Sequence, residues 1–97
     1  MVIGILEMIL YLPESHSLKD KRQVVKSILA RVHNQFNVAA AEIEDQDLWQ
    51  KAVLGIAVVS NDGKHANEVL STVVNFISGA NPAAEMSDYE LDISPVL

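Results

Sequence analysis

The chain has 97 residues, of which 49% are hydrophobic, and a formal net charge of −6 at neutral pH. This length is enough for one domain with a hydrophobic core, so residues 1–97 are predicted to form a single domain. The absence of cysteine excludes a disulfide framework, a thiolate nucleophile and a cysteine-bound metal site. This composition fits a reducing compartment, and we expect a cytoplasmic protein.

The first segment, Met1 to Leu12, is almost entirely apolar. It has no basic flank and no small-residue cleavage site, and Glu7 interrupts it, so it does not read as a signal peptide. It is also too short to cross a bilayer. We interpret Val2 to Leu12 as a β-strand that ends at Pro13, and we expect no membrane partner.

A helix is predicted from Leu18 to Gln35. Ser17 is a suitable N-cap, and Asp20 stands three residues later, as in a capping box. Apolar residues then recur at the spacing of one helix face: Val25, Ile28, Leu29, Val32 and Phe36. This face should pack on the core.

The rest of the chain alternates apolar segments with turn signals. The predicted elements are a strand from Phe36 to Glu44, a strand from Lys51 to Ser60, a helix with its inner face from Ala66 to Ile77, and a strand from Glu85 to Ile93. The order β-α-β-β-α-β predicts an α+β fold of the ferredoxin-like sandwich type. In it a four-stranded antiparallel sheet carries both helices on one face.

The strands beginning at Val2 and Lys51 are apolar on both faces, which predicts that they are central in the sheet. The last strand alternates, with Met86, Asp88, Glu90 and Asp92 on one side and Ser87, Tyr89, Leu91 and Ile93 on the other. An apolar patch on the helix-free face would be a liability in a monomer. We therefore expect a homo-oligomer, formed through the sheet or its edge.

The charge is unevenly distributed along the chain. Residues 15–36 contain five of the seven Lys and Arg side chains and one acid, which makes this segment +4 and the remainder −10. A wholly acidic protein repels nucleic acid, whereas a dipolar one can present a local anion site.

Lys19, Lys21 and Arg22 open the predicted helix, where its dipole disfavours cations, and Lys26 and Arg31 follow on it. A local rule broken without visible compensation is typical of functional sites. Lys19, Arg22 and Lys26 form one stripe, which His33 extends. We predict an anion-binding or RNA-binding site made of Lys19, Lys21, Arg22 and Lys26, which would bind phosphate groups. The alternative is a solvated helix face.

Other candidate residues carry weaker signals. Trp49 could stack on a base, but we favour the interpretation that it packs over the sheet edge. His16, His33 and His65 lack the spacing of a metal site, so no metal or cofactor is predicted. The strand beginning at Lys51 has no aromatic residue on which RNA bases could stack.

Four runs resemble the YlxP-like family of small uncharacterised bacterial proteins: His16 to Ser27, Phe36 to Val38, Gln46 to Ala52, and Gly55 to Asn61. The resemblance implies a ferredoxin-like fold. It brings no established activity and no catalytic residues. The genes of the family tend to lie among those for translation and ribosome maturation.

These observations favour a non-enzymatic domain that docks on RNA or a ribosomal particle through its basic first helix. The alternative is a dimeric small-molecule-binding protein or enzyme with a pocket at the sheet interface. No catalytic residue is predicted.

Overall fold

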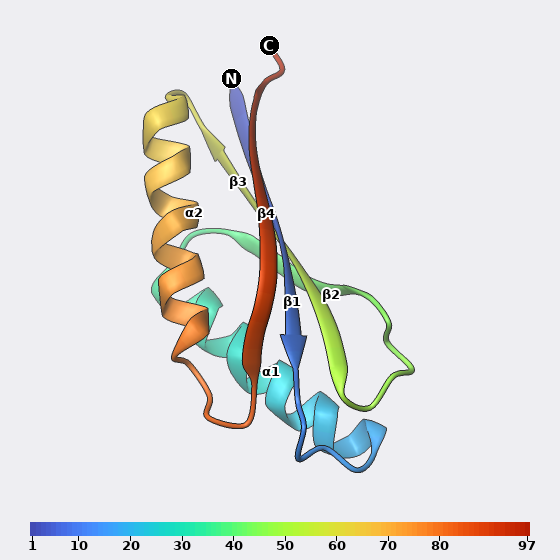
Figure 1. Ribbon diagram of the computed structural model, residues 1–97. Coiled ribbons are helices and arrows are strands. Elements are labelled where there is room, and N and C mark those ends of the chain that lie inside the picture. Colours follow the sequence, from blue (N-terminus) through green and yellow to red (C-terminus); the bar gives the residue numbers. More distant parts are fainter.

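A computed structural model describes residues 1–97 and contains four strands and two helices (Figure 1). In chain order they are β1 (Val2–Tyr11), α1 (Leu18–Gln35), β2 (Ala39–Glu44), β3 (Lys51–Ser60), α2 (Gly63–Ser78) and β4 (Glu85–Pro95). The order is the predicted β-α-β-β-α-β, and the ferredoxin-like α+β fold is confirmed.

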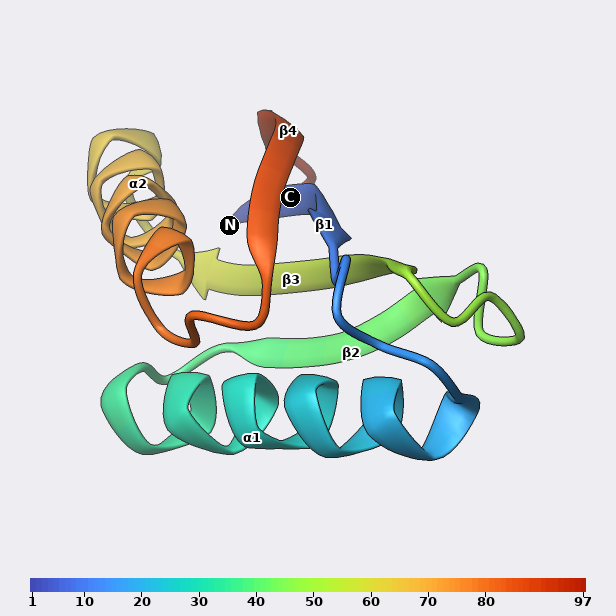
Figure 2. The ribbon, with the colours of Figure 1, turned by 60° about the horizontal axis from the view of Figure 1, so that its bottom comes forward.

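The four strands form one sheet in the order β2-β3-β1-β4. Every neighbouring pair is antiparallel, and β1 and β3 are central, as their two-sided apolarity predicted. Both helices cover the same face of this twisted sheet: α1 runs beneath β2, and α2 lies against β1, β3 and β4 (Figure 2). The other face carries no helix.

The core lies between the helices and the even-numbered residues of the central strands. Leu6, Met8 and Leu10 of β1 are at most 1% exposed, as are Leu54 of β3 and Ile28 of α1. They belong to a single cluster of 18 buried residues that joins both helices to the sheet. The odd-numbered residues of β1 and β3 therefore point to the helix-free face.

The structure corrects the side assigned to Met86. A β-bulge shifts the register of β1 and β4, so that Ile9 pairs with Asp88 but Leu10 pairs with Met86. Met86 therefore lies on the helix-covered side and packs against the core. Asp88 stays on the opposite side. The extra residue in the bulged strand reverses the alternation, which a strict period of two does not anticipate.

Three element boundaries also differ from the prediction. One is the end of β4, which runs two residues past Ile93 to Pro95. The strand predicted to begin at Phe36 begins at Ala39, because Phe36 caps α1 through its N–H, which donates to the Val32 carbonyl at 2.9 Å. β1 ends at Tyr11, one residue early, and the Leu12 N–H donates to the Gln50 carbonyl at 2.9 Å. Neither helix is both long and apolar enough to cross a membrane.

Candidate nucleic-acid interface

The start of α1 is fixed by reciprocal capping. The Asp20 N–H donates to the Ser17 hydroxyl at 3.0 Å, and the Asp20 carboxylate accepts from the His16 N–H at 3.0 Å. This satisfies two backbone donors at the helix start. The orientation of each cation in the first turns is therefore set from Ser17 onward.

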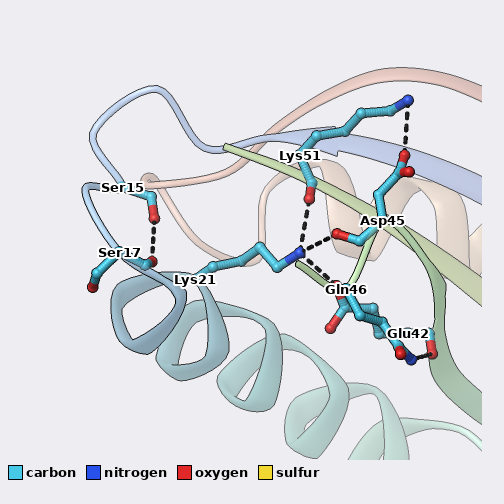
Figure 3. Close-up of polar contacts among 7 residues, drawn as sticks. All are labelled: Ser15, Ser17, Lys21, Glu42, Asp45, Gln46 and Lys51. Carbon is cyan, nitrogen blue, oxygen red and sulfur yellow. Dashed lines mark hydrogen bonds and ion pairs between the residues drawn. The ribbon is translucent and has the colours of Figure 1, made fainter. Parts of the chain in front are cut away.

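Lys21 lies on the inner side of this helix and is fully buried. Its Nζ lies 2.8 Å from the Glu42 carboxylate, and it donates to the carbonyls of Asp45 at 2.6 Å and Lys51 at 3.0 Å (Figure 3). An ammonium has three donors, and all three have partners inside the protein. Lys21 is therefore not part of the exposed cationic cluster that the sequence predicted, and it has no donor left for an external anion.

The contacts of Lys21 hold the β2–β3 hairpin against α1. The carbonyls it binds stand at the two ends of the hairpin loop, and the ion pair is the only contact made by Glu42 Oε2. A sequence signal for this role existed, because Lys21 precedes Val25 and Ile28 by four and seven residues. This spacing continues the apolar stripe of the helix.

Lys19, Arg22 and Lys26, which we call the free-cation stripe, lie on the outer flank of α1. All three are exposed, and none takes part in either of the two ion pairs of the structure. Arg22, Lys26 and His33 line a hollow between α1 and β2, which has Val25, Leu29, Ala30 and Glu42 as its other walls. The structure thus brings two of the predicted positions, Arg22 and Lys26, together with the predicted extension at His33.

The remaining Arg of the segment serves the fold. Arg31 lies on the opposite flank of α1, where its guanidinium donates to the Ala80 carbonyl. It also lies 5.5 Å from the centroid of the Phe76 ring, at a distance typical of a cation–π contact.

Lys51 forms a surface ion pair with Asp45, with Nζ 2.9 Å from the carboxylate. The hydrogen bond that Lys51 donates to Asp45, together with the negative charge of that carboxylate, raises the pKa of Lys51 above the ordinary value of 10.5. Among the seven basic side chains, only Lys64 at the start of α2 shares with the free-cation stripe an exposed position with neither an ion pair nor a side-chain hydrogen bond.

Trp49 does not pack over the sheet edge, and that interpretation is wrong. Its side chain is 54% exposed and lines a hollow with Tyr11 and His16 at the hairpin end of the sheet. No group of three or more His, Asp or Glu side chains is placed to hold a metal ion. The buried Ser15 hydroxyl donates to the Ser17 carbonyl at 3.1 Å.

Fold and site together define a ferredoxin-like α+β domain whose first helix presents unpaired cations beside a sheet edge. The chain belongs to the family described as "Protein of unknown function (DUF503)", which matches residues 3–91. The resemblance read from the sequence is confirmed by a relative from Bacillus subtilis (strain 168), "Uncharacterized protein YlxP". The two are 43% identical over 76 residues, which cover 78% of this chain and 83% of the relative.

A solved structure supports the fold alone. The de novo designed protein Foldit4 superposes with a TM-score of 0.55 at 13% sequence identity, and the match covers 100% of both chains. A likeness at this level of identity shows the shared arrangement of strands and helices alone.

Proposed function

We propose that this protein docks on RNA, or on an RNA-containing ribosomal particle, through the free-cation stripe of α1. The observation that carries the proposal is that Lys19, Arg22 and Lys26 are exposed, unpaired and on one flank of a helix in a chain of net charge −6. Such a chain has many carboxylates to pair them with. Cations kept unpaired among so many acids are available to an external polyanion.

The hollow beside the stripe adds a contact of a second kind. Its rim has Arg22, Lys26 and His33, and its other walls include the apolar side chains of Val25 and Leu29. Phosphates would contact the rim, while an apolar wall suits a sugar or a base face. The acidic remainder of the surface would repel RNA and thereby orient the protein, with α1 toward its ligand. This proposal places the protein in the cytoplasm.

The test is the salt dependence of binding to a fluorescein-labelled single-stranded RNA oligonucleotide, followed by anisotropy. Three phosphate contacts predict that log K falls with log salt with a slope of about −2. The variant Lys19→Gln, Arg22→Gln, Lys26→Gln should bind at least about tenfold more weakly and show almost no slope. Sedimentation with purified ribosomal subunits repeats the comparison on the particle.

A matched pair of single variants separates a site from bulk charge. Lys26→Gln and Lys64→Gln each remove one exposed, unpaired cation from a helix. Only Lys26→Gln should weaken binding and make the salt slope shallower by about 0.7. Equal effects of the two variants would reject the site, and a slope near zero for the parent protein would reject RNA binding altogether.

We also propose self-association, through the edge of β2. β2 has one hydrogen-bonded neighbour, and its first half is the uncharged run Ala39–Ala41. β4, the other edge, carries four carboxylates, and charged side chains on an edge are a device that prevents strand pairing. Two copies joined at β2 would bring their α1 helices to the same side. Light scattering should give twice the 10.6 kDa chain mass, and the single-chain mass would count against it.

The alternative of a small-molecule-binding protein or enzyme at a sheet interface differs in its response to salt. An apolar pocket responds little to ionic strength, whereas phosphate contacts weaken steeply. The same titration therefore discriminates the two.

A further inference from the structure

The helix-free side of the sheet, which we call the open face, is divided lengthwise into an apolar half and an acidic half. The odd-numbered residues of β1 and β3 point to it, and so do Ala39 and Ala41 of β2, through their pairing with Ala57 and Gly55. On β4 the carboxylates of Asp88, Glu90 and Asp92 also lie on this side, opposite Ile9, Glu7 and Ile5.

The apolar half is a trough over β1, β3 and β2. Small residues make its floor and larger ones its walls: Ala39, Ala41, Gly55 and Ala57, with Ile5 and Ile43. Ile5 is 49% exposed and Ile43 44% exposed. A floor of small side chains between branched ones leaves room for the side chains of another element to interdigitate.

The acidic half lies directly beside this trough. Glu7 and Glu90 are cross-strand partners, and together with Asp92 they line a second hollow that shares Ile5 with the trough. Like charges opposite each other destabilise a sheet. None of these carboxylates takes part in an ion pair. Cationic side chains of a bound partner would therefore relieve the repulsion among these carboxylates.

We infer that the open face binds a basic amphipathic helix of a partner protein. Its apolar side chains would fill the trough, and Lys or Arg along one flank would pair with Glu7, Glu90 and Asp92. A helix is the element that usually covers a sheet face as a second layer. Ten residues of β1 span about 33 Å, which a helix of about 20 residues matches in length.

The charges on this face argue against the other occupants. A second copy would bring the same carboxylates and, as its only cation on this side, Lys51, which is already paired with Asp45. It would also bury Glu7 without a partner, which is costly. RNA phosphates would be repelled by the same acids. This inference is independent of the RNA proposal, because α1 lies on the opposite side of the sheet.

The test uses a synthetic Leu/Lys peptide of about 20 residues, patterned as an amphipathic helix, and a peptide of the same composition in scrambled order. Titrated into isotope-labelled protein, the patterned peptide should shift the amide resonances of Ile5, Ala57 and Glu90 and leave those of Lys26 unchanged. Its affinity should exceed that of the scrambled peptide by at least about tenfold.

Matched variants locate the contact. Glu90→Gln with Asp92→Asn should weaken patterned-peptide binding about tenfold. Glu14→Gln with Glu68→Gln removes the same charge from exposed positions outside the open face and should change binding less than about twofold. Ile5→Thr keeps a branched side chain in the strand and should weaken binding about threefold, because it removes apolar contact from the trough wall.

Three results would overturn the inference. The first is equal loss of binding in the two charge variants, and the second is resonance shifts that gather on α1 or α2. The third is a protein that is dimeric by light scattering and that the peptide converts to monomer, because the open face would then belong to a second copy. Lys26→Gln should leave peptide binding unchanged, so failure here is distinguishable from failure of RNA binding.

Discussion

Lys21 and Arg22 are neighbours in the chain and serve opposite purposes. Lys21 is buried with three partners inside the fold, whereas Arg22 is exposed at the rim of a hollow without an ion pair. Successive residues of a helix are about 100° apart, so one step along the chain moves a side chain from the core flank to solvent. A run of cations on a helix is therefore two populations, and only one of them can be available to a ligand.

Removal of the buried Lys21 cation should have the largest effect on stability. Lys21→Met should destabilise the protein by about 3 kcal/mol, because it leaves the Glu42 carboxylate buried and two carbonyls without their donor. For a domain of this size that corresponds to a fall in Tm of more than about 10 °C. Thermal unfolding followed by circular dichroism measures it, with Lys64→Met as the exposed control, expected within about 0.5 kcal/mol of the parent.

A double variant shows whether the stability lost in Lys21→Met comes from leaving Glu42 without its ion-pair partner. Lys21→Met with Glu42→Leu replaces both charges by apolar groups and should recover much of the lost stability, as buried pairs generally do. If Lys21→Met has the same Tm as the Lys64→Met control, the buried contacts of Lys21 do not form in solution. Lys21 would then be an exposed cation like Lys19, Arg22 and Lys26.

Arg31 tests the other flank of α1. Arg31→Gln should cost about 1 kcal/mol, since it removes a charged donor from the Ala80 carbonyl and the contact with the Phe76 ring. Lys26→Gln is the control on the outer flank and should cost nothing. Urea unfolding of the two variants gives the difference, and equal midpoints would mean that the two flanks are equivalent for stability.

The fold was predictable because its signals are local and repeated. Pro13, the Ser17 cap and the two helical stripes mark the elements, and the two-sided apolarity of β1 and β3 marks the central strands. The prediction of which side Met86 faces was wrong because β4 contains one extra residue. The bulge beside Ser87 reverses which side Met86 faces, and nothing in an alternating pattern signals where the register shifts.

The candidate site was predictable in part. Charge counting found Lys19, Arg22 and Lys26, but it grouped Lys21 with them, because the partners of Lys21 come from β2 and the hairpin, 21 to 30 residues away. The acidic half of the open face was likewise predictable only in part. Alternation placed Asp88, Glu90 and Asp92 on one side of the last strand, but Glu90 lies beside Glu7 because β4 pairs with β1.

The free-cation stripe should have no stabilising role. Replacing Lys19, Arg22 and Lys26 with glutamine should leave Tm unchanged or raise it, since a cation in the first turns opposes the helix dipole by about 0.3–1 kcal/mol. The effect should be largest for Lys19 and smallest for Lys26, which lies farther along the helix. A calorimetric scan at low salt measures it. A clear fall in Tm would show that these side chains support the fold.

The smallest effect concerns Lys51, the one cation with a surface partner. Asp45 raises its pKa in the folded protein, so its stabilising contribution is fully present below the unfolded pKa near 10.5 and is lost as pH rises through the higher folded value. Asp45→Asn should therefore lower Tm slightly at neutral pH, and this difference should shrink in strongly alkaline solution. Asparagine tolerates the left-handed backbone that Asp45 adopts, with φ of 56°, so the substitution tests the charge alone. A difference in Tm that stays constant through the alkaline range would show that the Asp45 carboxylate does not act through its pairing with Lys51.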